Sequence, residues 1–341
     1  MKTYTVITSI QAPTDSVKKL VQKLMPTQCR LLVIGDTKSP ERYELDNTEF
    51  YSLDKQLSLP FKLASRLPTE HYSRKNIGYL IAISEGASSI YETDDDNAPL
   101  ESWGYREKQI DVRKVCQSGW VNIFQAFSDE LIWPRGFPLS EIKVSVNNKL
   151  VSSEEELTID APIQQGLAEG SPDVDAVWRL AMDKEIHFNG DDSYYLPVGA
   201  WCPFNSQSTW WWPEAYPLLY LPSFCSFRMT DIWRGFIAQR CLWAMGYGLV
   251  FHPPEVYQER NKHDLMKDFT DEIPGYQRNQ ELIKLLTDLE LDNDKMSVGS
   301  NMLHCYNKLV EEEFFTNDEL ILVHNWLDDL DAIQSNSLLS R

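Results

Sequence analysis

The sequence lacks several features that would assign it quickly to a class of protein. Its six cysteines are widely spaced and form neither a Cys-x-x-Cys pair nor the His/Cys spacing of a zinc site. Such isolated thiols are typical of a reducing compartment. No apolar run approaches the roughly 20 residues that span a membrane, and no signal-peptide pattern is visible. We therefore expect no membrane span in this chain. The expected location is cytoplasmic, or that of a soluble lumenal domain if the chain is part of a longer protein.

Basic residues are also scarce. Lysine and arginine number 32 against 51 aspartates and glutamates, which gives a formal net charge of −19. This charge argues against DNA, RNA or anionic lipid as partners, because all three repel an acidic surface. It equally means that an anionic ligand needs a local cation or basic cluster to reverse the field. A divalent metal ion held by carboxylates would meet that need.

The first hundred residues alternate between strand-like and helix-like segments. Tyr4–Ser9 and Leu31–Ile34 are apolar and β-branched, and Ile90–Thr93 is a third such run. Between the first two, Val17–Leu24 repeats apolar residues on one helical face, and a second helix is expected around Ile77–Ile81. This β-α-β-α-β order predicts an α/β fold with a parallel sheet and right-handed crossovers.

Acidic residues follow two of these expected strands. Asp36 comes after the second strand, and Asp94, Asp95 and Asp96 come directly after the third. Ligands of parallel α/β sheets bind at the carboxyl ends of the strands. Carboxylate oxygens suit Mg²⁺ or Mn²⁺, and these ions bridge readily to phosphates. Because side chains alternate along a strand, Asp94 and Asp96 are the pair expected to share one ion. A solvated acidic turn is the alternative.

Several longer strings carry a resemblance to a known family. The chain resembles the STELLO glycosyltransferases, which are in turn distantly similar to the reversibly glycosylated polypeptides that act as UDP-arabinopyranose mutases. The strings are RKNIGY at 74–79, IYETDDDN at 90–97, DVDAVWRL at 173–180, PVGAWCPFNSQSTWW at 197–211, PLLYLP at 217–222 and FRMTDIWR at 227–234. The resemblance implies a GT-A fold, a Rossmann-like nucleotide-sugar-binding domain, over residues 1–260. A helical C-terminal extension would follow over residues 261–341.

The resemblance also implies roles for individual residues. The metal, Mn²⁺ or Mg²⁺, would be held at a DxD-type motif by Asp94 and Asp96, with His252 completing the shell. Asp231 would be the general base, although an acid in the first turn of a helix is also favoured by the helix dipole. The residues expected to bind the donor are Thr8, Ser9, Asp36, Arg74, Lys75, Asp94, Asp95 and Arg179. Trp210 and Trp211 would form an acceptor-sugar platform, with core packing as the alternative.

These expectations lead to one favoured function and two alternatives. The favoured function is a metal-dependent glycosyltransferase that passes a sugar from a nucleoside diphosphate, expected to be UDP, to the hydroxyl of a glycan or another acceptor. The first alternative is a UDP-sugar pyranose/furanose mutase, which would contract the donor ring without releasing UDP. The second is a non-catalytic glycan-binding scaffold on a GT-A frame.

Overall fold

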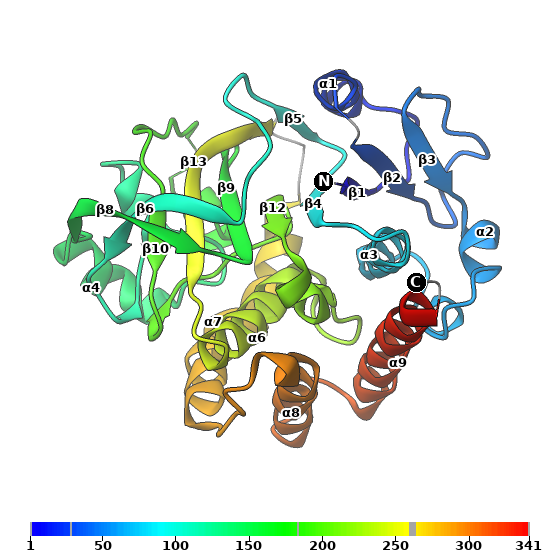
Figure 1. The fold of residues 1–341 in the computed structure, drawn as a ribbon. Coiled ribbons are helices and arrows are strands. Elements are labelled where there is room, and N and C mark those ends of the chain that lie inside the picture. Colours follow the sequence, from blue (N-terminus) through cyan, green and yellow to red (C-terminus); the bar gives the residue numbers. More distant parts are fainter. Residues whose placement is uncertain (1, 28, 183, 259–263, 340–341) are drawn as a thin grey trace.

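The computed structural model describes residues 2–27, 29–182, 184–258 and 264–339, and it has a mixed α/β fold (Figure 1). The expected domain boundary near residue 260 lies outside the described residues. In the N-terminal part, four parallel strands pair in the order β3-β2-β1-β4. The alternating sequence pattern predicted β1, β2 and β4 and a parallel sheet, but it did not predict β3. Their bounds are β1 Thr3–Thr8, β2 Arg30–Ile34, β3 Thr48–Tyr51 and β4 Ser89–Thr93.

The sheet continues beyond β4 with strands of both directions. β12 pairs antiparallel with β4 and with β9, and β9 pairs parallel with β13. From β13 the order runs through β10 and β6 to the edge strand β8, while β5 pairs with β13 off this path. The bounds are β5 Asn97–Pro99, β6 Gln109–Val115, β8 Ser152–Asp160, β9 Ile163–Gly170, β10 Tyr194–Leu196, β12 Ser208–Trp211 and β13 Leu249–Gln258. A separate two-stranded sheet joins β7 (Gly119–Trp120) and β11 (Ala200–Trp201).

Alternating strand residues divide the core between the two faces of this sheet. On β1, Val6 belongs to the apolar cluster around α3, whereas Ile7 belongs to the cluster around α1. The same alternation separates Trp211 from Trp210 on β12. A strand whose successive side chains are all buried must be covered on both faces, which is why this sheet carries helices on each side.

The helices cover the sheet unevenly. α1 packs against β5 and β2, whereas α3 packs against β1 and β2 and is itself contacted by α9. Figure 1 shows α6, α7, α8 and α9 grouped on the same side as α3. The C-terminal segment is helical, as expected, and shares the apolar core of α3 and α6. The bounds are α1 Asp15–Leu24, α2 Leu53–Leu57, α3 Lys75–Ser84, α4 Ile142–Asn147, α5 Ala176–Ala181, α6 Thr230–Ala244, α7 Leu265–Asp288, α8 Val298–Glu311 and α9 Asn317–Leu339.

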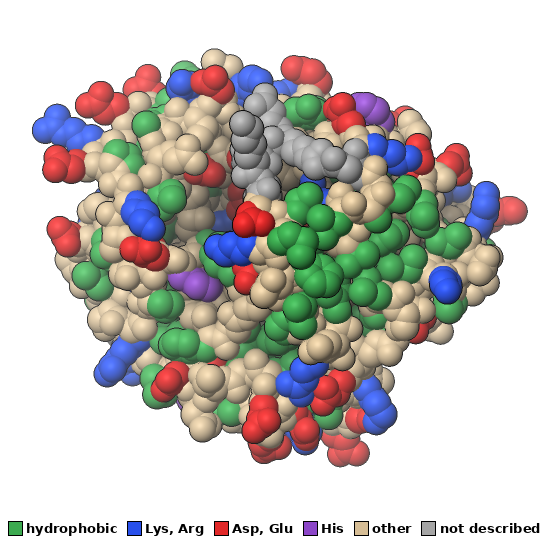
Figure 2. Space-filling view, turned by 180° about the vertical axis from the view of Figure 1, so that it is seen from behind, with side chains coloured by type: hydrophobic (Ala, Val, Ile, Leu, Met, Phe, Trp, Pro, Cys, Tyr) green, Lys and Arg blue, Asp and Glu red, His purple; other side chains and the backbone are tan. Residues whose placement is uncertain are grey.

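The surface agrees with the charge of the sequence. On the face in Figure 2, acidic and basic side chains are interspersed around a hydrophobic area, and the described side chains form no extended basic patch there. Among the described residues, none of the helices combines the length and the apolar character needed to cross a membrane.

Candidate functional site

The three aspartates after β4 face two different cavities. Asp94 and Asp96 line a cleft of about 120 Å³, whereas Asp95 lines a larger cavity of about 530 Å³. This division follows the alternation expected at the end of a strand, and a turn closed by the Asn97 amide donating to the Asp94 carbonyl maintains it. The triplet therefore forms the wall between the two cavities.

Each aspartate is oriented by a hydrogen-bond donor from another element. The Lys75 ammonium donates to Asp94 Oδ1 at 2.8 Å, and the Ser9 hydroxyl donates to Asp95 Oδ2 at 2.6 Å. The Gln258 amide donates to Asp96 Oδ2 at 2.9 Å. Burial raises the pKa of Asp94 to about 6, although Lys75 opposes this effect. A carboxylate destabilised by burial gains from a further cation beside it.

The position of Lys75 depends on a close contact between α3 and the sheet. Lys75 is the first residue of α3 and is fully buried, with its ammonium also donating to the Thr93 carbonyl at 2.8 Å. One turn later, a Cβ on Gly78 would lie 2.4 Å from a methyl group of Val6 on β1. Glycine at this position thus allows α3 to approach β1 closely enough for Lys75 to reach the carboxyl end of β4.

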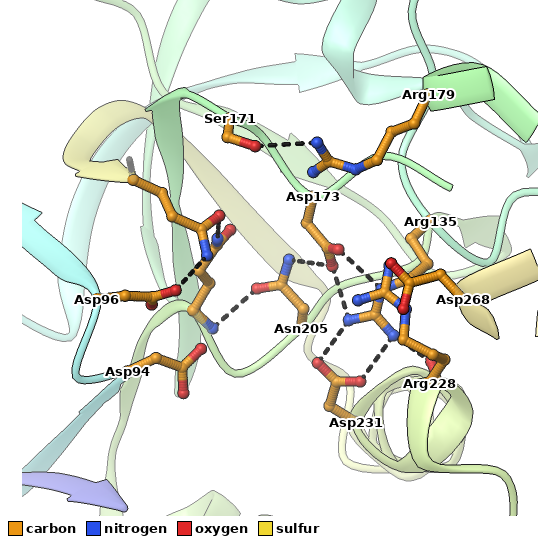
Figure 3. Close-up of a pocket in the computed structure, with 12 residues that line it drawn as sticks. Asp94, Asp96, Arg135, Ser171, Asp173, Arg179, Asn205, Arg228, Asp231 and Asp268 are labelled. Carbon is orange, nitrogen blue, oxygen red and sulfur yellow. Dashed lines mark hydrogen bonds and ion pairs between the residues drawn. The ribbon is translucent and has the colours of Figure 1, made fainter. Parts of the chain in front are cut away.

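Asp231 lies across the cleft from Asp94, in the first turn of α6 (Figure 3). Arg135 forms two hydrogen bonds with its carboxylate, Nη1 to Oδ1 at 3.0 Å and Nη2 to Oδ2 at 2.9 Å. The same guanidinium also binds Asp173, through Nε at 2.7 Å and Nη2 at 2.8 Å. Burial alone raises the pKa of Asp231, but the charge and hydrogen bonds of Arg135 outweigh burial and hold the pKa below its ordinary value.

Two more arginines line the cleft. Arg228 donates to Glu272 Oε1 through Nε at 2.9 Å and Nη2 at 2.7 Å, which links the cleft to α7. Arg179 donates to the Ser171 hydroxyl and the Pro172 carbonyl, both at 2.9 Å. The structure thus places Arg179 in the cleft with Asp94, Asp96 and Asp231. Sequence reasoning did not single out Arg135, Asp173, Asn205, Gln207, Arg228, Gln258 or Asp268, which also line it.

The larger cavity lies at the carboxyl ends of β1 and β2. Four of the expected donor-binding residues line it besides Asp95, namely Thr8, Ser9, Asp36 and Arg74. The side chain of Arg74 is buried and already used within the protein. It donates to Gln56 Oε1 at 2.8 Å and to the carbonyls of Leu67 and Ala64 at 3.2 and 3.3 Å. Arg74 therefore shapes this cavity, whereas Lys75 contacts the aspartate triplet through Asp94.

The structure does not bring His252 to the aspartates. β13 continues through His252 to Gln258, so this residue lies inside a strand and not at its end. Its ring is fully buried, with Nδ1 2.7 Å from Ser193 Oγ and Nε2 2.9 Å from Gln164 Oε1. Both ring nitrogens of His252 already have partners, so the expectation that His252 completes the metal shell was wrong. Among the described residues, no group of three or more His, Cys, Asp or Glu side chains is arranged to hold a metal ion.

The expectation that Trp210 and Trp211 form a platform for the acceptor sugar was also wrong. Trp210 and Trp211 lie on β12 in the middle of the sheet, and both rings have no accessible surface. Trp211 Nε1 donates to Glu92 Oε1 at 2.9 Å, and the Arg234 guanidinium lies 5.0 Å from its ring centroid. Aromatic residues favour strands, and this run forms one in the interior of the sheet. The two tryptophans therefore pack into the apolar cores on opposite faces of the sheet.

An α/β sheet with polar cavities at the carboxyl ends of its parallel strands is an arrangement that suits ligand binding. A model of the family described as STELLO glycosyltransferases matches residues 228–337. The chain is 30% identical to "Probable glycosyltransferase STELLO1" of Arabidopsis thaliana and 29% identical to "Probable glycosyltransferase STELLO2" of the same plant, over 96% and 95% of its own length. The chain thus contains a STELLO glycosyltransferase family domain over residues 228–337 and is similar to two STELLO proteins over most of its own length.

The chain spans 44% of the length of each of the two Arabidopsis proteins. A solved structure described as "Crystal Structure of a Mycobacterial Protein" overlaps 84% of this chain and 73% of its own, but with a TM-score of 0.37 and 8% identity.

Proposed function

We propose that this chain is a metal-dependent glycosyltransferase with a GT-A-type site, which transfers a sugar from a UDP-sugar to an acceptor hydroxyl. The match to the STELLO family model and the similarity to STELLO1 support the reaction class. The observation that carries the proposal is the position of Asp94–Asp96 between two adjoining cavities. The larger cavity has room for a nucleoside, and the carboxylate-lined cleft beside it suits the diphosphate and the reacting sugar.

The residues of the cleft fit a hard divalent cation. Asp94 and Asp96 line the same cleft, and the amide side chains of Asn205, Gln207 and Gln258 add further oxygen atoms to its wall. Mg²⁺ is commonly bound by one or two carboxylates together with substrate phosphates, so a complete protein cage is not required. When bound, the ion would neutralise charge on the leaving diphosphate.

The chain's own charges suit the remainder of the donor. Among the described residues that line the cleft, carboxylates outnumber guanidinium groups, which favours a metal-bound diphosphate over a lone one. Lys75 holds Asp94 in a fixed orientation, and the Ser9 hydroxyl does the same for Asp95 in the larger cavity. Arg179 and Arg228 line the cleft as fixed positive charges beside the proposed diphosphate position.

Asp231 is the residue we assign to the acceptor hydroxyl. Its low pKa keeps the carboxylate ionised at neutral pH, which is the state that accepts a proton or a hydrogen bond from a hydroxyl group. Arg135 fixes the orientation of this carboxylate, and the Ser206 amide donates to it at 3.3 Å. Asp173 binds the same guanidinium group of Arg135 and is less buried than Asp231. The effect of substituting Asp173 is therefore the natural comparison for the effect of substituting Asp231.

The test is calorimetric titration of UDP into the protein with Mn²⁺ and with excess chelator, for wild type and Asp96→Asn. We expect binding that requires both the metal and Asp96. Asp331→Asn is the matched control, because Asp331 is an exposed aspartate on α9 and does not line the cleft. Equal binding by Asp96→Asn would refute the metal site. A wild-type protein that binds no UDP under any metal would refute the uridine donor.

A further inference from the structure

His71 and Asp36 meet at one wall of the larger cavity. Both residues line it, and the His71 backbone amide donates to Asp36 Oδ2 at 3.2 Å. Asp36 Oδ1 accepts from the Thr37 amide at 2.7 Å. A carboxylate oxygen has two lone-pair directions, so Asp36 can accept a further hydrogen bond from a ligand. The two backbone donors fix the orientation of the carboxylate in the cavity.

The hydrogen bonds of His71 determine which ring nitrogen carries the proton. The Ser73 amide donates to His71 Nδ1 at 3.0 Å, so Nδ1 is the unprotonated nitrogen and Nε2 carries the hydrogen. Nε2 makes no hydrogen bond to any residue that the structure describes. Burial lowers the pKa of His71 although Asp36 opposes this effect, so the ring is neutral at pH 7. The cavity wall thus presents one N–H donor beside one carboxylate acceptor.

We propose that His71 and Asp36 together read the imide edge of a uracil base, with His71 Nε2–H donating to the C4 carbonyl and Asp36 accepting from N3–H. This inference rests on the proposed nucleotide-sugar donor. Cytosine presents the reverse pattern at the same edge, with an amino donor at C4 and an unprotonated N3. Its amino group would face the N–H of His71, and its N3 lone pair would face the carboxylate of Asp36, so neither hydrogen bond could form. His71 is therefore a specificity-determining residue of the donor site.

Phe227 supplies a surface that does not depend on the identity of the base. It lines the same cavity, its side chain is 50% exposed, and its ring contacts His71 and Tyr72 edge to face at centroid distances of 5.5 and 4.8 Å. An exposed aromatic ring of this kind packs against any flat base. Removing the Phe227 ring should weaken the binding of all nucleotides alike. This effect distinguishes general packing from recognition of the imide edge.

The experiment compares the affinities of UDP, CDP and GDP in the presence of Mn²⁺. We expect wild type to prefer UDP over CDP on the order of 100-fold, because two hydrogen bonds are replaced by two unfavourable contacts. His71→Asn keeps an acceptor for the Ser73 amide but loses the Nε2 donor, so the UDP/CDP ratio should fall by about 10-fold. His71→Gln places an amide donor near the position of Nε2 and should restore part of the ratio. Phe227→Ala should lower both affinities and leave the ratio unchanged.

The outcomes separate this inference from the donor site itself. Mn²⁺-dependent binding of UDP and CDP with equal affinity would overturn the role of the pair while leaving the donor site intact. An unchanged UDP/CDP ratio in His71→Asn would overturn the role of His71 specifically. If wild type binds no nucleoside diphosphate with Mn²⁺, the donor site is refuted and this inference falls with it. Thermal unfolding of each variant checks that the fold is preserved.

Discussion

Replacing Arg135 by methionine should destabilise the protein strongly, because Arg135 is the positive charge shared by the buried carboxylate of Asp231 and the partly buried carboxylate of Asp173. Its side chain is 6% exposed, and it hydrogen-bonds to Asp173 and Asp231 at 2.7 to 3.0 Å. It also donates to the Arg228 carbonyl. Removing one partner of such a buried pair typically costs about 3–5 kcal/mol, since the remaining charges stay desolvated without compensation. For a chain of 341 residues this corresponds to a fall in Tm of roughly 4–7 °C.

The stability lost in Arg135→Met should depend on pH, and the loss should be larger at neutral pH than at acidic pH. In wild type the pKa of Asp231 is below its ordinary value, so the ion pair stabilises the fold at all pH values above about 4. Without Arg135, burial becomes the main influence and raises the pKa of Asp231 above its value in the unfolded chain. The variant is then least stable, relative to wild type, at neutral pH. It recovers part of the deficit as the pH falls and the carboxyl group takes up a proton.

The assay is urea unfolding of wild type and Arg135→Met between pH 8 and pH 5. Arg113→Met is the control, since Arg113 pairs with Asp192 at 2.7 Å with both side chains about one-third exposed or more. Loss of an exposed pair of this kind typically costs under about 1 kcal/mol. If Arg135→Met costs no more than Arg113→Met and its deficit does not vary with pH, the reasoning about the shared guanidinium is wrong.

Two further predictions test the corrected roles of sequence-predicted site residues. Trp211→Ala should lower the free energy of unfolding by about 3–5 kcal/mol, because it empties a fully buried site, and a UDP affinity reduced without loss of stability would contradict this. Burial holds the pKa of His252 well below its ordinary value, so the stability that depends on its neutral ring is lost as the pH falls below about 6.5. His252→Gln should weaken this acid dependence in unfolding experiments and leave Mn²⁺ affinity unchanged; a 10-fold loss of Mn²⁺ affinity would return His252 to the metal site.

Local patterns in the sequence predicted five elements of the N-terminal part of the fold but not β3, α2 or β5. Each expected strand and helix of the first hundred residues is present, because apolar periodicity reports directly which faces of an element are buried. The helix expected after residue 230 is also present as α6.

The sequence by itself also determined which residues could reach the site from the parallel strands. Asp36 and Asp94–Asp96 directly follow apolar strands, and the carboxyl ends of neighbouring parallel strands lie on one edge of the sheet. Strand alternation further indicated that Asp94 and Asp96 would face one side and Asp95 the other. These conclusions need only the periodicity of a strand and the handedness of its connections.

Only the tertiary structure decided which other side chains meet these aspartates. Arg135 and Asp231 are 96 residues apart in sequence, and Gln258 and Asp96 are 162 apart. Whether a histidine or tryptophan is exposed was likewise undetermined, because His252 and Trp211 lie on strands buried by partners from distant segments. Local periodicity specifies the faces of an element, but long-range packing specifies what covers each face, and that packing arises only when the whole chain has folded.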